Sequence, residues 1–387
     1  MLKNYFKTAL RNLSHNKVFS TINILGLAIG ISASLVIFLI VQYDFSFDKF
    51  EKDGDRIYRV VTQNSENVPF PLADALQNKV TGMEVVAPLT PWNYEVKVSV
   101  AKENSEDISV FRKEPNIVFA DPGYFKLINY KWLAGSPNSS LSTLYQTVLT
   151  EKNAKRFFPH LSFNDIIGKE ITFNDHNDTI RTTVSGIVEN LKANTDLNFQ
   201  TFVSISTQSS LHPESLNSWK SFSSNLFVRL SKNTDPQLVK NQIAQVYKLH
   251  SKTNNNTNSN NEFDLQPLSD LHFSTMYDNF GQRKAYMPTL YGLMAVAGIL
   301  LLLACINFIN LTTAQSSQRA KEIGIRKTLG GSRKQLIFQF LSETFILTLI
   351  ATILSIIIAP LLLKTFSDFI PEGLHFNIRQ PGVILFL

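Results

Sequence analysis

The side chains best suited to ionic chemistry lie together in a short basic stretch, residues 316–336, between two long apolar runs. Six cations accompany a single acid there. Short loops with such an excess of Lys and Arg stay on the cytoplasmic side of a membrane, because moving the cations across a bilayer is costly. The stretch therefore predicts a cytoplasmic loop and sets the expected topology. Its charged residues are Arg319, Lys321, Glu322, Arg326, Lys327, Arg333 and Lys334.

The interior of this loop also predicts structure. Residues 320–329 have the composition of a short helix, Gly330 and Gly331 break it, and Ser332 is a candidate N-cap for the helix that follows. A loop that only connected two helices would not need a short helix, a glycine break and an N-cap.

Motifs for self-contained catalysis are missing from the sequence. The Gly330–Lys334 segment lacks the spacing of a phosphate-binding loop, and Ser204 and Ser206 lack the G-x-S-x-G turn of a hydrolase. The histidines are scattered, and one cysteine, Cys305, allows neither an intrachain disulfide nor a cysteine metal site. We expect a non-catalytic chain without metal or cofactor, with nucleotide hydrolysis supplied by another chain.

Several carboxylates in the polar middle of the chain are individually ordinary in their sequence context. They are Asp44, Asp48, Asp121 and Asp196. The net charge of +6 could suggest a nucleic-acid partner, but much of the excess lies beside the apolar runs. The positive-inside pattern accounts for that placement, so no nucleic-acid partner is expected.

Three apolar runs must position the basic loop. Residues 18–43 carry no charge and are long enough for a first membrane helix. Gly26, Gly30 and Ser34 recur at every fourth residue of it, which predicts a face that another helix can approach closely.

The second membrane helix is expected within residues 288–315 and the third over 337–363. Asn307 and Asn310 lie near the cytoplasmic end of the second helix. We expect them to pack against another helix, with a substrate contact as the alternative. Glu343 lies early in the third helix, where a carboxylate can still reach water or a basic partner in the loop.

The remaining segments complete the expected order. Residues 1–17 predict a basic amphipathic helix on the inner membrane surface, with the start of a signal peptide as the alternative. Residues 44–287 form a large domain outside the cytoplasm. Residues 364–381 return outside, and 382–387 begin a fourth membrane helix inside which the chain stops.

Local patterns within residues 44–287 alternate between strand and helix without a strict βαβ series, which predicts an α+β domain. The polar tract at 253–261 predicts a flexible loop. Strands are expected at 57–62, 85–89, 94–100, 116–120, 147–150, 171–173, 182–188, 199–204 and 225–230, and helices at 71–79, 151–158 and 236–250. The fold class is thus an α-helical membrane bundle with a large α+β extracytoplasmic domain inserted between helices 1 and 2.

This order and several segments resemble the MacB/FtsX family of ABC transporter permeases. The N-terminal segment 11–35 is similar to the family's first helix. Residues 304–344, ACINFINLTTAQSSQRAKEIGIRKTLGGSRKQLIFQFLSET, are similar to its permease signature. Segments similar to its periplasmic core domain are 120–137, 147–158, 184–199 and 265–274.

The resemblance implies a cytoplasmic ABC ATPase as partner, with ATP and magnesium acting on that subunit. It also implies a homodimer or a second permease half in a longer polypeptide, contact with membrane lipid, and an additional periplasmic adaptor as a further candidate partner. The loop between the second and third helices would sit on the ATPase. Ile323 and Ile325 would enter an apolar groove while the cations pair with acids at its rim. The implied contact residues are Glu322, Ile323, Gly324, Ile325, Arg326, Lys327, Leu329, Gly330 and Gly331.

The expected function is a permease subunit in the inner membrane of a bacterial cell, with its N-terminus cytoplasmic and its large domain periplasmic. ATP-driven movement would be passed to that domain by mechanotransmission, for efflux or export of a peptide, an antibiotic-like compound or a lipoprotein. The alternative is a signalling subunit that activates a periplasmic partner such as a cell-wall hydrolase. The large size of the outer domain favours transport. A membrane sensor without an ATPase would leave the basic loop unexplained.

Overall fold

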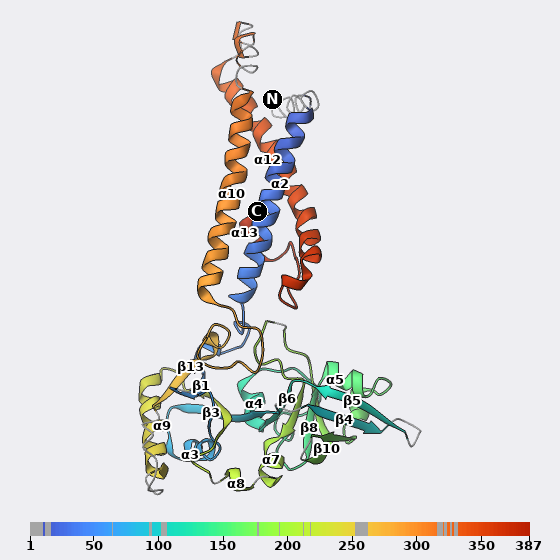
Figure 1. The fold of residues 1–387 in the computed structure, drawn as a ribbon, viewed down its shortest axis with the longest axis vertical. Helices are drawn as coiled ribbons and strands as arrows, with labels where there is room; N and C mark the ends of the chain where they lie inside the picture. Colours follow the sequence, from blue (N-terminus) through green and yellow to red (C-terminus); the bar gives the residue numbers. More distant parts are fainter. Residues whose placement is uncertain are drawn as a thin grey trace. The chain divides into compact units, whose positions relative to one another are not determined.

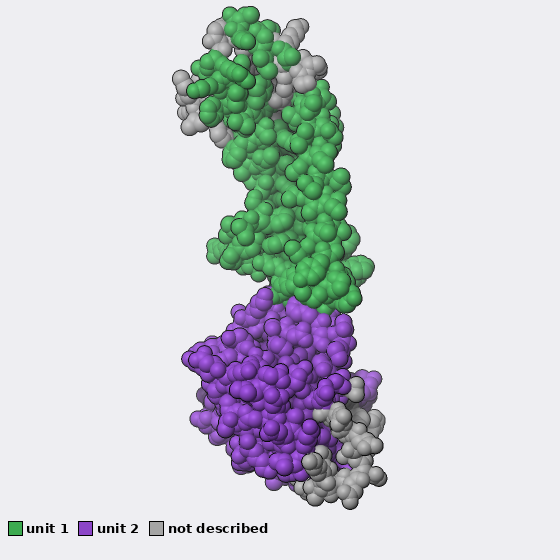
Figure 2. Space-filling view, turned by 90° about the vertical axis from the view of Figure 1, so that its left-hand side faces the viewer, with its two compact units in different colours: residues 1–45, 285–387 green, residues 46–284 purple. Residues whose placement is uncertain are grey.

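The computed structural model divides the chain into two compact units, residues 1–45 with 285–387 and residues 46–284 (Figure 2). It describes residue 11 and residues 17–63, 65–92, 95–101, 107–175, 178–192, 194–211, 213–216, 218–251, 262–315, 320, 323–325, 327–328 and 332–387. The amphipathic helix expected over 1–17, apart from residues 11 and 17, and the polar tract at 253–261 lie outside the described residues.

Three helices of the first unit are long and apolar enough to cross a membrane (Figure 1). They are α2 (Lys17–Asp44), α10 (Met287–Ala314) and α12 (Arg333–Thr365). Their positions match the three apolar runs of the sequence. This unit ends with the short elements η3 (Ser367–Phe369) and α13 (Pro381–Phe386).

Helix α12 begins where the sequence predicts. The Ser332 side chain accepts a hydrogen bond from the Gln335 backbone N–H, and the Gln335 side chain accepts one from the Ser332 backbone N–H. This reciprocal capping box satisfies two N–H groups that the first helical turn would leave without partners. The expected N-cap role of Ser332 is confirmed.

The second unit is built around one mixed sheet whose strands do not follow sequence order. The order is β13-β1-β12-β3-β6-β11-β8-β10-β9-β4-β5, with β2 paired to β12 and β7 paired to β10. Most pairs are antiparallel, while β6–β11 and β8–β10 are parallel. The expected α+β class is confirmed. The strands are β1 (Ile57–Thr62), β2 (Val68–Pro69), β3 (Met83–Pro91), β4 (Val96–Ala101), β5 (Ile108–Glu114), β6 (Ile117–Ala120), β7 (Trp132–Gly135), β8 (Gln146–Thr150), β9 (Glu170–Asn174), β10 (Thr179–Val188), β11 (Thr201–Ser204), β12 (Phe222–Leu230) and β13 (Phe263–Pro267).

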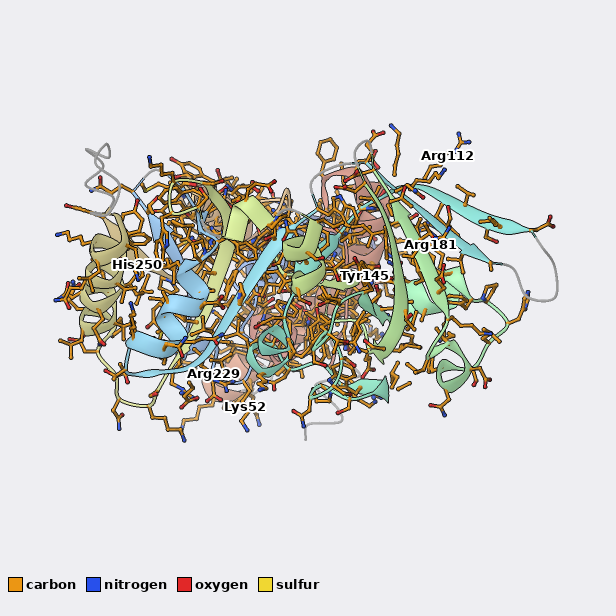
Figure 3. The ribbon with its side chains drawn as sticks, turned by 90° about the horizontal axis from the view of Figure 1, so that it is seen from below. Lys52, Arg112, Tyr145, Arg181, Arg229 and His250 are labelled. Carbon is orange, nitrogen blue, oxygen red and sulfur yellow. The ribbon has the colours of Figure 1, made fainter. Side chains whose placement is uncertain are left out.

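Short helices cover the two ends of this sheet. Helices α3 and α9 pack at the β1 and β13 end, and α5 and α6 pack near β4, β9 and β10. Seen from below, His250 of α9 lies at one end of the unit, and Arg112 and Arg181 lie at the other (Figure 3). The helical segments are η1 (Gly54–Arg56), α3 (Leu72–Lys79), α4 (Pro122–Leu127), α5 (Glu151–Phe157), α6 (Phe163–Ile166), α7 (Ile205–Leu211), α8 (Pro213–Leu216), α9 (Pro236–Ser251) and η2 (Leu268–Asp270).

Strands β1 and β13 are neighbours in the sheet although they are far apart in sequence. Val60 pairs with Leu265, and Tyr58 pairs with Pro267. Strand β1 follows α2 along the chain, and β13 precedes α10. The two ends of the outer domain, each leading to a membrane helix, are therefore joined by backbone hydrogen bonds.

Candidate coupling site

Four of the nine residues expected to contact an ATPase are described: Ile323, Gly324, Ile325 and Lys327. Residues 323–325 and 327–328 are helical, as the sequence predicts for this part of the loop. The other five, Glu322, Arg326, Leu329, Gly330 and Gly331, lie outside the described residues.

The described part of the loop presents an apolar side chain to solvent. Ile325 is 55% exposed, whereas Ile323 is half-buried. A Cβ added at Gly324 would meet no described atom within 4 Å. The Thr328 hydroxyl donates to the Ile325 carbonyl at 2.7 Å, which holds this turn locally. An exposed isoleucine beside an open glycine and the exposed Lys327 suits a protein contact, because such contacts combine an apolar centre with charged neighbours.

Helix α2 packs against both other membrane helices, and its small residues lie at the contact with α10. A Cβ at Gly30 would overlap the Cβ of Ala304, so only glycine fits there. A Cβ at Gly26 would lie 3.1 Å from the Asn307 amide nitrogen. The buried Ser34 hydroxyl donates to the Ala297 carbonyl at 2.9 Å. The stripe Gly26–Gly30–Ser34 therefore faces α10 along its length.

The two asparagines of α10 differ in their surroundings. Both side chains are exposed, and Asn307 also lies close to Gly26 of α2. Within the described part of the chain, neither side chain makes a hydrogen bond to another helix. No sequence pattern marks Asn23 of α2, which is 2% exposed and whose amide has no hydrogen-bond partner among described residues. Glu343 of α12 is also buried, at 5% exposure.

The other contact of α2 is with α12. Ala28 of α2 and Ala351 of α12 are fully buried in one apolar cluster, and Leu35 and Ala359 are fully buried in another. Near the end of α2, the Tyr43 hydroxyl donates to the Glu372 carbonyl at 2.7 Å. One helix is thus held along its length by both partners.

The outer domain buries a polar cluster that the sequence did not indicate. Asp48 lies in the segment that follows α2, with a positive φ of 55°, and is 4% exposed. The Thr195 hydroxyl donates to its carboxylate, and its own backbone N–H donates to the Asn194 carbonyl at 3.0 Å. Burial is the main cause that raises the Asp48 pKa to about 7, and the nearby carboxylates of Asp196 and Glu51 act in the same direction.

The same cluster includes residues from the segment that leads to α10. His272 Nδ1 lies 3.1 Å from an Asp196 carboxylate oxygen, and the Asn279 amide donates to that oxygen at 3.0 Å. The rings of Phe47 and His272 are stacked with centroids 3.5 Å apart. Because these residues are separated by more than seventy positions, only the folded chain brings them together.

A buried arginine holds the same terminal segment to β1. Arg59 is fully buried and donates to the Gln266 side chain at 3.0 and 2.7 Å and to the Asp278 carbonyl at 2.7 Å. Its guanidinium also lies 5.9 Å from the Tyr277 ring centroid and 5.7 Å from that of Phe280. Burial lowers the Arg59 pKa to about 10, which still leaves the side chain charged at neutral pH.

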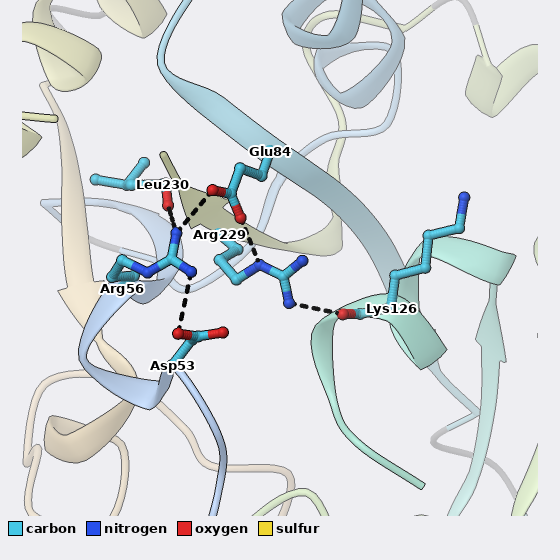
Figure 4. Close-up of polar contacts among 6 residues, drawn as sticks. All are labelled: Asp53, Arg56, Glu84, Lys126, Arg229 and Leu230. Atoms are coloured by element: carbon cyan, nitrogen blue, oxygen red, sulfur yellow. Dashed lines mark hydrogen bonds and ion pairs between the residues drawn. The ribbon is translucent and has the colours of Figure 1, made fainter. Parts of the chain in front are cut away.

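A surface network fastens the first turn of the domain to its sheet (Figure 4). Glu84 of β3 accepts from Arg56 at 2.9 Å and from Arg229 at 3.1 Å. Arg56 also contacts Asp53 at 3.1 Å, and Arg229 donates to the Lys126 carbonyl at 2.8 Å. The two arginines hold the Glu84 pKa below its usual value.

Two family models cover the chain and decide its assignment. The MacB-like periplasmic core domain matches residues 20–246, and the FtsX-like permease C-terminal domain matches residues 294–387. The first match alone includes more than half of the chain. The chain belongs to the MacB/FtsX family of ABC transporter permeases.

Proteins described as ABC transporter permeases are similar to this permease over shorter stretches of sequence. Two uncharacterized ABC transporter permeases of Bacillus subtilis (strain 168) are similar to it. YknZ is 42% identical over 76 residues, or 20% of this chain and 19% of that protein. YvrN is 34% identical over 89 residues, or 23% of this chain and 21% of that protein. Each match spans about a fifth of the relative's length.

Two solved structures are also similar to the permease. A permease-protein domain from Porphyromonas gingivalis has a TM-score of 0.46 and 18% identity, over 63% of this chain and 99% of that one. The periplasmic region of MacB from Actinobacillus actinomycetemcomitans has a TM-score of 0.39 and 17% identity, over 56% of this chain and 90% of that one. The family assignment rests on the two family models.

The described residues of the permease contain no group of three or more His, Cys, Asp or Glu side chains placed to hold a metal ion. Cys305 is exposed on α10. Apart from the basic loop, the described residues of this permease show a closely packed α2 and a buried polar cluster around Asp48 within the outer domain.

Proposed function

We propose that this permease couples ATP hydrolysis by a separate cytoplasmic ATPase to movement of its outer domain. The observation that carries the proposal is the path of contacts from the loop outward. The loop lies between α10 and α12, both helices pack against α2, and α2 and α10 continue into segments joined through β1 and β13. A displacement of α12 or α10 would reach both connections to the outer domain.

The receiving surface in this proposal is the exposed turn at Gly324 and Ile325, together with Glu322, Ile323, Arg326, Lys327, Leu329, Gly330 and Gly331. Apolar burial of Ile325, with 55% of its surface available, would supply contact energy. The cations would favour a partner with an acidic surface and would orient it by electrostatic attraction. ATP and magnesium would act only on the ATPase.

A matched pair of glycine substitutions tests this surface. Gly324→Trp should prevent co-purification of an ATP-hydrolysing subunit from membranes, because the indole would occupy the contact. Gly292→Trp on α10 is the control, since a Cβ there also meets no described atom within 4 Å. Both variants should appear in the membrane fraction in normal amounts. Retention of full ATPase activity by the Gly324→Trp preparation would refute the assignment.

The proposed role is efflux or export of a peptide, an antibiotic-like compound or a lipoprotein, rather than activation of a periplasmic enzyme. The size of the outer unit, residues 46–284, supports transport. The proposed location is the inner membrane of a bacterial cell, with the N-terminus cytoplasmic. A reporter fused at Asn255 should be extracytoplasmic and one at Gly330 cytoplasmic. The reverse pattern would overturn the topology.

Further partners are proposed from the outward face of α10. Only 11% of its most apolar 18-residue stretch is buried within the chain, whereas 44% of the corresponding stretch of α2 is buried. Its exposed side chains include Tyr291, Met294, Ile299, Leu302 and Ile306. We propose that lipid and a second permease half, from another copy or a longer polypeptide, cover this face. Cross-linking through Cys305 would detect a second copy near this helix. A periplasmic adaptor remains a further proposed partner.

A further inference from the structure

The turn that follows α12 exposes two phenylalanines. Phe369 of η3 is 84% exposed, and Phe366, which precedes η3, is also exposed. Backbone hydrogen bonds hold the turn, because the Phe369 N–H donates to the Phe366 carbonyl at 2.9 Å and the Ile370 N–H donates to the Ser367 carbonyl at 3.2 Å. The two rings are therefore kept on the outside of a short, fixed turn.

These rings continue an apolar stripe of α12. Large exposed apolar residues recur at every fourth position of that helix, which gives a stripe that winds slowly around it. The stripe leads directly to the turn, so helix and turn present one continuous apolar surface. Its members on the helix are Phe345, Leu349, Ile353, Ile357 and Leu361.

The length of α12 places the turn at the edge of the bilayer. The stretch between Glu343 and Lys364 has no charged residue and contains 20 residues, 344–363. At about 1.5 Å per residue it is about 30 Å long, which is the thickness of the hydrocarbon core. Lys364 therefore lies at one border of the core, and Phe366 and Phe369 follow it closely in the chain.

The segment after the turn is held against α2. Leu374 is buried in the apolar cluster that includes Leu35 of α2, and Ile370 packs against the same cluster. The Glu372 carbonyl accepts from the Tyr43 hydroxyl of α2 at 2.7 Å. These contacts keep the segment beside the membrane helices, while the two phenylalanines stay exposed.

The charges around the turn are balanced. At neutral pH, residues 364–380 carry two cations, Lys364 and Arg379, and two acids, Asp368 and Glu372. A segment without net charge is not attracted to an anionic membrane surface. Any contact of this turn with lipid must therefore come from its apolar rings.

We propose that the turn after α12 is a lipid anchor, in which Phe366 and Phe369 enter a phospholipid bilayer at the border between headgroups and acyl chains. Apolar side chains of interfacial segments bury at this depth. The anchor would hold the end of α12 at a fixed depth in the membrane. It assigns to lipid part of a segment that the sequence places outside the membrane. The inference is independent of ATPase coupling, because it concerns only the depth of one turn.

The test uses the full chain in phosphatidylcholine nanodiscs, with Cys305→Ser to remove its one cysteine. A nitroxide spin label on Phe369→Cys reports collisions with oxygen, which concentrates in lipid, and with a nickel chelate, which stays in water. The oxygen-to-nickel collision ratio should be roughly fivefold or more above that of the control, Glu372→Cys, an exposed acid of the same segment. Replacing a third of the lipid with phosphatidylglycerol should leave the ratio unchanged.

Equal ratios at positions 369 and 372 would overturn the proposal, because the ring would then lie in water. Rare collisions with both reagents at position 369 would also overturn it, since a protein surface, such as a second copy of the chain, would then cover the turn. A ratio that rises with phosphatidylglycerol would contradict a contact made by apolar rings.

A second variant keeps an aromatic side chain in the turn. Phe369→Trp adds fluorescence to that of the native tryptophans, which all lie within residues 46–284. The added fluorescence should fall roughly twofold or more in nanodiscs of dibrominated phosphatidylcholine. Leu361→Trp, on the exposed stripe of α12, sets the quenching expected for a side chain in lipid. Quenching of Leu361→Trp without quenching of Phe369→Trp would refute the anchor.

Discussion

The membrane unit and the outer domain of this permease differ in the contacts that fix their helices and strands. In the membrane unit, small residues bring backbones together, as at Gly30 against Ala304, and the buried polar groups Asn23 and Glu343 lie among mainly apolar side chains. In the outer domain, charged groups such as Asp48 and Arg59 are buried and held by hydrogen bonds. The physical reason is the solvent: lipid gives apolar helices no hydrophobic reason to associate, so close packing must do so, whereas water drives burial of a large core.

The contrast bears on how movement would be passed on. A helix interface made of small residues can slide or separate at little polar cost, while a joint of buried charges resists any change that exposes or unpairs them. We therefore expect the flexible part of the proposed coupling path to lie between the membrane helices. The rigid part would lie where segments 46–51 and 271–280 meet in the outer domain.

The largest expected effect is at the buried arginine. Arg59→Met should destabilise the outer domain by about 4 kcal/mol, because the Gln266 side chain and the Asp278 carbonyl lose a charged donor. Tryptophan fluorescence during urea unfolding measures this selectively, since Trp92, Trp132 and Trp219 all lie within residues 46–284. Arg112→Met on exposed β5 is the control. A change below about 1 kcal/mol would show that the joint is not held by this charge.

The second test uses pH. Asp48 has a folded pKa of about 7 against 3.8 for an unperturbed carboxyl, so the folded state favours the protonated form. Its contribution to stability is fully present below pH 3.8 and is lost as the pH rises through 7. Asp48→Asn mimics the protonated form and can still accept from Thr195.

The variant should therefore match the unmodified chain near pH 4 and be more stable at pH 7.5, by on the order of 3 kcal/mol. Fluorescence-monitored urea unfolding at both pH values measures the difference. Equal pH dependence in the two proteins would mean that the folded carboxyl is not held in its protonated form.

The membrane interface should show a smaller effect, which arises from overpacking of side chains and not from a buried charge. Gly30→Leu places a side chain against Ala304 and should destabilise the membrane unit by about 2 kcal/mol through overpacking. Gly298→Leu on α10 is the matched control, because a Cβ there meets no described atom within 4 Å. Thermal aggregation in detergent, followed by size-exclusion chromatography, should separate the two variants. Equal losses in both would contradict the close approach at Gly30.

The smallest expected effect is at the one cross-helix hydrogen bond that the described residues of the Gly26–Gly30–Ser34 stripe make. Ser34→Ala removes the bond to the Ala297 carbonyl and should cost about 0.6 kcal/mol, the usual size of such bonds in membranes. The same thermal assay applies. A loss as large as that of Arg59→Met would break the contrast between the two units, because polar bonds would then dominate in both.

The sequence did not predict strand β5 or helix α4, because their local residue patterns are not typical of a strand or a helix. Strand β5 exposes most of its residues and mixes charged with apolar side chains, so its pattern did not stand out. Helix α4 has six residues and begins with Pro122 and Gly123, which read as a turn. In both segments, contacts with neighbouring strands outweigh the local pattern, and those contacts are visible only in the folded chain.

The sequence by itself determined the three membrane helices, the cap at Ser332, most central strands and the family, because each depends on neighbours within a few residues or on a motif. The tertiary structure alone decided the order of the thirteen strands, the pairing of β1 with β13, and the cluster of Asp48, Thr195, Asp196, His272 and Asn279. It also buried the ordinary Asp121 at the start of α4, and this burial raises the pKa of its carboxyl group to about 7. Burial and long-range contact set these properties, and neither is written in the residues that flank them.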